Sequence, residues 1–241
     1  MATREEIEYA ILQVVAEEKW RDLTNIRLRT TNAILKIAAG IKMPDGRISP
    51  PLPDLHTTIT VATVTDAAYK TLGATYHRGI YLVANDDDEK IYPPKGGDYY
   101  SFEKFLKQAI YKDLTESGEI YMVCVKGTNL YYQGRPSSSE NLLVYCYRLP
   151  VAMSTDAGTP DGLPSAFALN LPKFFVLREI FGEMIGKDVK QEVKYPDKAF
   201  SLWRHYNAEF YKEMEELIGF IGQHDDEPQY YDCDSEYAED E

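Results

Sequence analysis

Histidines and acidic runs are the first residues of this chain to consider for catalysis or metal binding. The histidines are His56, His77, His205 and His224. No two of them lie three or four residues apart, the spacing that would place two metal ligands on one helix face. The run DDDE at 86–89 lacks the glycine and terminal glutamate of an EF-hand loop, so we interpret it as a solvated turn.

Phosphate-binding and nucleophile motifs are also missing from the sequence. Gly73, Gly79 and the pair 96–97 form no G-x-x-x-x-G-K loop. Ser154 and the serines at 137–139 lack the G-x-S-x-G context of an activated nucleophile. The sequence therefore predicts no enzyme, no cofactor and no metal site. A small hydrolase or nucleotide-modifying enzyme whose site residues meet only in the fold is the alternative of a different class.

Cysteine usage and hydropathy indicate the compartment. Cys124, Cys146 and Cys233 are odd in number and lack CxxC spacing, which argues against a disulfide framework or a zinc site. Cys124 and Cys146 lie in apolar strand patterns and are predicted to be small buried residues in a reducing compartment. The amino terminus is charged from its fourth residue, and no apolar run approaches the ~20 residues needed to span a bilayer. No signal peptide and no membrane partner are expected.

Tyrosine is the unusual component of an otherwise ordinary composition. The chain has 241 residues, 44% of them apolar, which is enough for a real core. It contains 19 Tyr against 9 Phe and 2 Trp. Half-buried sheet positions account for more than half of these tyrosines. The remainder suit surfaces that meet other proteins, because Tyr offers a large amphipathic contact area with few rotatable bonds.

The acidic charge is concentrated at the carboxy terminus. The net charge is −13, and no Lys or Arg follows Lys212. Residues 223–241 contain nine carboxylates, and such a composition predicts a disordered tail. Because this tail would repel phosphates, sequence-reading DNA binding is not expected.

Helices are predicted at both ends of the chain. Thr3 and Glu6 have capping-box spacing before the first helix, and Asp22 caps a second one that ends at Gly40. The two helices should pack as a hairpin. Helical periodicity returns over 163–186, where Pro172 indicates either a kink or the true start of a shorter helix, and again over 197–221.

The middle of the chain has strand patterns. Strands are predicted at 57–65, at 79–85 and three times within 119–150, with a helix at Ser101–Thr115. The fold class is therefore α+β, a helical bundle of the amino- and carboxy-terminal helices with an inserted antiparallel β region. The predicted divisions are a helical pair at 1–42, the inserted region at 43–162, helices that complete the bundle at 163–222 and the acidic tail at 223–241.

Two segments are candidate partner interfaces. The proline-rich arm 43–56 contains more apolar side chains than a plain linker needs, namely Ile48, Leu52 and Leu55. The acidic tail contains three spaced tyrosines, Tyr230, Tyr231 and Tyr237. These could anchor a strap that orders on a partner while its carboxylates meet a basic groove. A purely solubilising tail is the alternative.

The order of short motifs resembles the head-to-tail adaptor family of tailed bacteriophages, the podovirus-type ring proteins between portal and tail. The motifs follow an amino-terminal helical pair. They are the run from Tyr121 to Leu130 with Val123 and Lys126-Gly127, the turn Arg135-Pro136, a strand ending in Tyr145–Pro150, an acidic loop with Asp156 and Asp161, and Leu163-Pro164 before the helical end. This resemblance covers most of the chain.

The resemblance implies a virion structural protein without chemistry of its own. It implies a ring of about twelve copies beneath the portal protein. The other face of this ring would meet a tail tube or nozzle protein. DNA would pass through as cargo, so an acidic or neutral lumen is preferable. The protein would be made in the host cytoplasm and reside at the virion neck. A tail-tube or baseplate ring component is the nearest alternative.

Overall fold

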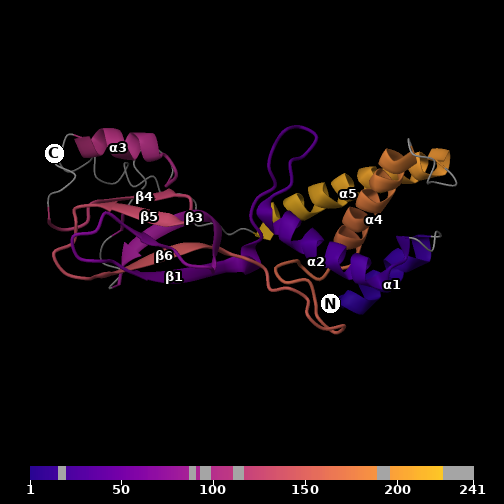
Figure 1. The fold of residues 1–241 in the computed structure, drawn as a ribbon, viewed down its shortest axis with the longest axis horizontal. Coiled ribbons are helices and arrows are strands. Elements are labelled where there is room, and N and C mark those ends of the chain that lie inside the picture. Colours follow the sequence, from indigo (N-terminus) through magenta and orange to yellow (C-terminus); the bar gives the residue numbers. More distant parts are fainter. Residues whose placement is uncertain (16–19, 87–90, 93–98, 111–116, 189–195, 225–241) are drawn as a thin grey trace. The chain divides into compact units, whose positions relative to one another are not determined.

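The chain folds into two units joined by two connections. The computed structural model describes residues 1–15, 20–86, 91–92, 99–110, 117–188 and 196–224. The helical unit comprises Met1–Pro53 and Ala152–Glu241, and the β unit is Asp54–Val151 (Figure 1). The predicted α+β class is confirmed, because the amino- and carboxy-terminal helices pack together and the antiparallel strands lie between them in sequence. The predicted insertion, 43–162, is longer than the β unit and extends beyond it in sequence at both ends.

Helix α1 (Arg4–Val14) begins with the predicted capping box. The Glu6 amide donates to Thr3 Oγ1 at 3.3 Å, and the Thr3 amide donates to Glu6 Oε2 at 2.8 Å. These bonds satisfy amides that the first helical turn otherwise leaves without partners. The apolar side of α1 contributes Ile7 and Ile11 to the core, both with 0% exposure.

Helix α2 (Leu23–Ala39) also begins and ends where the sequence predicts. The Thr24 amide donates to the Asp22 carboxylate at 3.1 Å. Gly40 follows the helix with φ of 101°, a backbone conformation that side chains disfavour and glycine accepts. Helices α1 and α2 pack against each other and against α4, as the hairpin prediction expected for the first pair.

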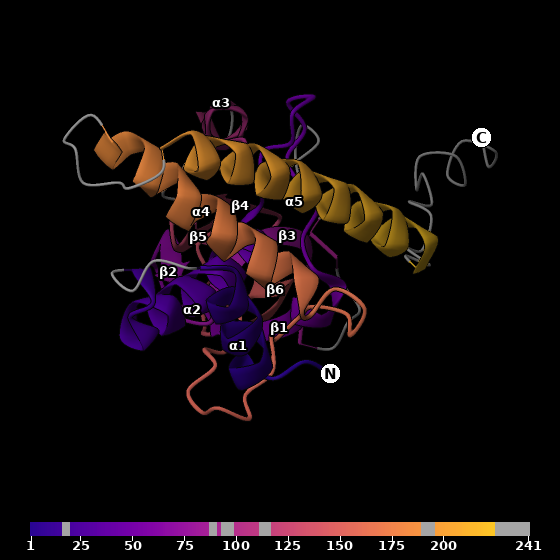
Figure 2. The ribbon, with the colours of Figure 1, turned by 90° about the vertical axis from the view of Figure 1, so that its right-hand side faces the viewer.

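Helix α4 (Asn170–Asp188) begins later than the apolar pattern over 163–186 indicates. Turns precede it, and Pro172 lies in the first helical turn. A missing N–H costs nothing there, because amides of the first turn lack helical acceptors. Of the two predicted alternatives, the shorter helix is the one observed. Helix α5 (Pro196–His224) packs along α4 through Phe175 and Phe210, whose ring centroids are 5.5 Å apart (Figure 2).

The β unit is a sandwich of two antiparallel sheets. The first sheet has the order β1-β6-β3 and the second β2-β5-β4. The strands are β1 (His56–Ala62), β2 (Tyr69–Thr71), β3 (Tyr76–Asn85), β4 (Met122–Lys126), β5 (Asn129–Gln133) and β6 (Asn141–Arg148). Five of these correspond to predicted strands. Strand β2 was not predicted, because three exposed residues give no apolar alternation.

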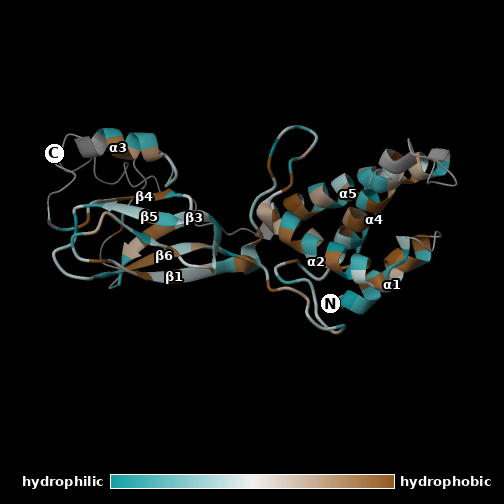
Figure 3. Ribbon diagram, in the orientation of Figure 1, coloured by the Kyte–Doolittle hydropathy of each residue, from teal (hydrophilic) through white to brown (hydrophobic). Residues whose placement is uncertain are grey.

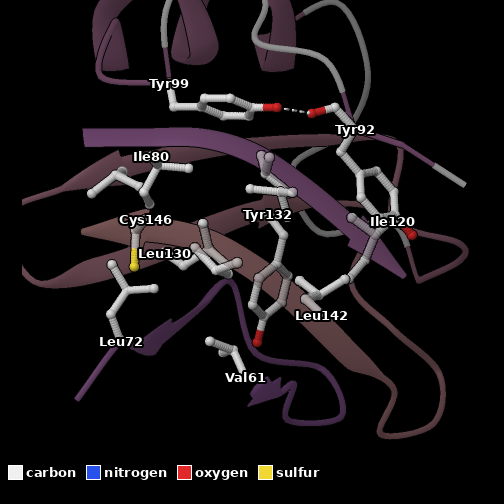
Figure 4. Packing of buried hydrophobic residues seen from close by; sticks show 14 residues of the cluster. Val61, Leu72, Ile80, Tyr92, Tyr99, Ile120, Leu130, Tyr132, Leu142 and Cys146 are labelled. Carbon is white, nitrogen blue, oxygen red and sulfur yellow. Dashed lines mark hydrogen bonds between the residues drawn. The ribbon is translucent and has the colours of Figure 1, made fainter. Parts of the chain in front are cut away.

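The core of the β unit lies between the two sheets (Figure 4). Val144 and Leu142 of β6 face Val123 and Leu130 of the other sheet, and all four are almost fully buried. Tyr132 is 1% exposed, and its hydroxyl accepts a hydrogen bond from the Val64 amide at 3.3 Å. The Tyr132 hydroxyl therefore has a partner inside the apolar layer, as burial requires.

Helix α3 (Phe102–Ile110) covers the outer side of the second sheet. Figure 3 shows α3 beside β4. Phe105 packs against Met122 and Cys124, which lie on the opposite side of β4 from the sandwich core. Strand β4 is thus buried on both faces, which explains its continuous apolar sequence. The predicted end of this helix at Thr115 lies outside the described residues.

Both described cysteines are expected to resist alkylation in the folded protein. Cys124 and Cys146 are buried free thiols, as predicted, and Cys233 lies outside the described residues. Burial raises the pKa of the Cys146 thiol to about 11, so only about one molecule in a thousand would hold the thiolate at pH 8. Mass spectrometry after iodoacetamide treatment should show both residues unmodified in buffer and modified in denaturant. Rapid alkylation of Cys146 in buffer would contradict its burial.

Candidate interaction surfaces

The residues first considered for catalysis lie on different elements or in ordinary contacts. His56 is on β1, His77 is half-buried on β3 and His205 is exposed on α5. The Asp86 carboxylate accepts a hydrogen bond from Asn141 Nδ2 at 2.9 Å, while the rest of the DDDE run lies outside the described residues. Within the described ranges, no three His, Cys, Asp or Glu side chains gather as metal ligands would.

The proline-rich arm contributes to both units. Ile48 is 68% exposed, whereas Leu52 and Leu55 are 2% and 1% exposed and pack in the interior. The apolar surfaces of these two leucines are thus used inside the chain, and Ile48 is the candidate of this arm that reaches solvent. Arg47 ties the arm to α5, with its guanidinium 3.5 Å from the Glu215 carboxylate. Tyr230, Tyr231 and Tyr237 lie outside the described residues.

An ionic clamp fixes the acidic loop to the start of α1. Arg4 Nη1 donates to the Met153 carbonyl at 2.8 Å, and Arg4 also pairs with Asp156. The Glu8 carboxylate, only 4% exposed, lies 3.2 Å from Arg4 Nε and 3.3 Å from Arg27 Nε. The Arg4–Glu8 pair is close but poorly aligned for a hydrogen bond, so its attraction is mainly coulombic. The clamp therefore links α1 and α2 to the loop at Met153–Asp156, which is distant from both helices in sequence.

This clamp should weaken in acid. A hydrogen bond from Arg4 holds the pKa of Asp156 below its ordinary value of 3.8. A carboxylate with a lowered folded pKa stabilises the fold fully above its ordinary pKa, and that contribution is lost as the pH falls below about 4. Hydrogen-exchange protection of the Arg4 and Glu5 amides, which donate to loop carbonyls, should fall in that range. The Ile26 amide is the control, and equal protection at pH 2 and pH 6 would contradict the effect.

An aromatic cluster occupies the outer side of the β1-β6-β3 sheet. This tyrosine face consists of His56, Tyr81, Tyr145 and Tyr147. The His56 ring centroid lies 4.5 Å from that of Tyr147 and 5.2 Å from that of Tyr81. Tyr81 is 41% exposed, and Tyr145 and Tyr147 are half-buried. No described helix of the β unit covers this side, in contrast to the α3-covered sheet.

A groove in the helical unit lies between α2 and α4. It consists of two adjacent hollows of about 510 and 370 Å³ that share Lys36, Arg178 and Glu179. The Arg178 guanidinium carbon lies 3.8 Å from the Phe210 ring centroid and 4.5 Å from that of Phe175. These distances indicate cation–π contact with both rings.

The charges along this α2–α4 groove are mostly paired, with Arg178 as the exception. Arg29 forms a two-bond pair with Glu183 at 2.8 and 3.0 Å, and Lys36 lies 2.6 Å from Glu179. Arg178 has no ion pair with a carboxylate in the described part of the chain. Desolvation lowers the pKa of Arg178, and a contact with Tyr211 and the charge of Glu179 partly offset that effect. The sequence does not point to this arginine, because its aromatic partners lie on two helices and no local spacing reveals them.

Comparisons with known proteins do not assign a family. No protein-family model matches the chain, and a search of curated proteins found no match. None of the helices in the described ranges is long and apolar enough to cross a lipid bilayer.

Proposed function

We propose that this protein is a head-to-tail adaptor of a tailed bacteriophage, forming a ring that joins the portal protein to the tail and lets DNA pass. The observation that carries the proposal is the insertion of a β sandwich into a bundle of terminal helices. Helices at both ends of the chain with a sheet region between them are the arrangement that the resemblance implies.

The motifs behind the resemblance coincide with junctions of the fold. The run from Tyr121 to Leu130 forms the β4–β5 hairpin, with Gly127 in its turn at φ of 62°. The pair Arg135-Pro136 follows β5 after one residue, and Tyr145–Pro150 ends β6 at the exit from the β unit. Leu163-Pro164 lies in the turns that lead into α4. These motifs lie at turns and at connections between elements. Residues at such positions favour a shared architecture over a chance match between strand sequences.

The charge of the chain also suits a DNA conduit. A net charge of −13 gives phosphates no general attraction, so DNA would slide past without being held. A ring of identical subunits needs two different contact patches on each copy, because its contacts close by rotation. The tyrosine face is well suited to one of them, since exposed aromatics are enriched at protein interfaces.

Electron microscopy of the protein mixed with its portal protein tests the proposal. We expect rings coaxial with the portal, and a sedimentation species containing both proteins. Particles that remain separate at micromolar concentration would contradict an adaptor role. Tubes formed without portal would favour the tail-tube alternative instead.

The tyrosine face can be tested by a matched pair of substitutions. Tyr81→Asp places a charge among aromatic rings and should weaken ring formation by at least about tenfold in concentration, because a desolvated charge at an interface costs more than ~1.4 kcal/mol. Tyr69→Asp is the control, since Tyr69 is 50% exposed on β2 and outside this face. Mass photometry over a concentration series measures both. Equal ring formation by the two variants would exclude the face from the ring contact.

A further inference from the structure

We propose that the α2–α4 groove binds the protein's own acidic carboxy-terminal segment, residues 225–241, with Arg178 as the central contact for a carboxylate. The proposal goes beyond the adaptor function and does not depend on it, because it concerns the free protein.

Arg178 is the first reason to expect an acidic occupant. Its guanidinium is stacked on the Phe210 and Phe175 rings and lies where the two hollows join. The nearby carboxylates of Glu179 and Glu183 already pair with Lys36 and Arg29. The Glu179 charge acts on Arg178 as well, but Glu179 forms its hydrogen bond with Lys36. A further carboxylate could bind the Arg178 guanidinium through both of its oxygens at once.

The charge balance of the groove is the second reason. Four cations line the two hollows, Arg29, Lys36, Lys42 and Arg178, against two carboxylates, Glu179 and Glu183. The segment 225–241 has nine carboxylates and no Lys or Arg. It also has tyrosines beside its acids, as in Tyr231-Asp232, and these can pack on the apolar stems of the groove lysines. The segment and the groove are therefore complementary in sign.

The position of the end of α5 is the third reason. Phe220 contacts Phe167 with ring centroids 5.6 Å apart, so α5 ends beside the start of α4. That end is nearer to the hollow containing Phe175 than to the other one, because Phe175 comes first along α4.

The length of the segment matches the distance to be covered. From Tyr211, which lies beside Arg178, to the end of α5 at His224 is about 20 Å, at ~1.5 Å per helical residue. An extended chain covers that distance in about six or seven residues. Counting six or seven residues along the sequence from His224 gives Tyr230 and Tyr231, with Asp232 next, so we expect these residues to be the ones that reach Arg178. The spacing therefore brings aromatic and acidic residues of the segment to the arginine together.

Cross-linking of the full-length protein tests the proposal. A carbodiimide joins carboxylates directly to amines, and the links can be located by mass spectrometry. We expect links from carboxylates of 225–241 to Lys36 and Lys42 at least about fivefold more often than to Lys70, an exposed lysine on β2. Links should fall in 0.5 M salt, because exposed ion pairs are screened. A mixture of ¹⁴N- and ¹⁵N-labelled protein distinguishes links within one copy from links between copies.

Two variants separate specific binding from general attraction. Arg178→Gln removes the central charge but keeps every amine, so links at Lys36 and Lys42 should fall about fivefold or more. Lys42→Glu should lower the links at Lys36, whereas Lys70→Glu, with the same change in net charge, should not. Thermal melting of each variant confirms that it folds. Unchanged links in Arg178→Gln, equal linking to Lys70, or links only between copies would each overturn the proposal.

Discussion

Replacing Gly134 by alanine should destabilise the β unit by at least about 2 kcal/mol. Gly134 has φ of 70°, and a Cβ there would meet the Glu119 carbonyl oxygen and lie 2.7 Å from its carbon. The neighbouring backbone is held by hydrogen bonds, including Gly118 N to the Arg135 carbonyl at 2.7 Å and Tyr121 N to the Gln133 carbonyl at 2.9 Å. The clash therefore cannot be relieved by moving a flexible side chain. Chemical denaturation followed by tyrosine fluorescence measures the loss.

Gly127 is the matched control for this substitution. It also has a positive φ, 62°, but nothing lies within 4 Å of a Cβ placed there. Gly127→Ala should therefore cost about 1 kcal/mol, the backbone penalty alone. The difference between the two variants isolates the contact with Glu119. Equal losses would mean that the segment around Glu119 moves aside at little cost.

Phe210→Ala should cost the helical unit about 3–5 kcal/mol, the usual range for deleting a buried aromatic ring. Phe210 is 0% exposed and joins α5 to α4 through the Phe175 ring. It also supports the Arg178 guanidinium at 3.8 Å, so its loss removes a cation–π contact as well as apolar burial. Helical circular dichroism during thermal unfolding should show a melting temperature lower by several degrees.

Phe200→Ala is the control on the same helix. Phe200 is 47% exposed and stacks on Trp203 with ring centroids 6.0 Å apart. Removing it leaves no enclosed cavity, so we expect a loss of no more than about 1 kcal/mol. A loss at Phe200 as large as that at Phe210 would show that the outer side of α5 is packed more tightly than its exposure indicates.

The sequence predicted those features of the fold that depend on neighbouring residues. The capping box at Thr3, the cap at Asp22 and the end at Gly40 are confirmed, because each depends on bonds within a few residues. The strands with β-branched or apolar alternation were found for the same reason. Strand β2 was missed, since its pairing with β5 and not its composition makes it a strand.

The features that the sequence did not predict arise from contacts between distant residues. Arg4 and Glu8 resemble ordinary solvated charges near the start of a helix, yet both are buried and Arg4 bonds to the loop at Met153–Asp156. Leu52 and Leu55 were predicted to meet a partner because the arm contains more apolar side chains than a plain linker needs, and in this chain both are buried. The arrangement around Arg178 likewise needs two helices that are separated in sequence.

The insertion of one unit into the other has a consequence for biosynthesis. The β unit is a single continuous stretch, Asp54–Val151, whereas the helical unit needs both ends of the chain. A ribosome therefore releases a complete sandwich while α1 and α2 still wait for α4 and α5. Because domains fold as units during translation, the sandwich should form first. The exposed apolar sides of the first two helices would then be vulnerable to proteases and aggregation until the last third emerges.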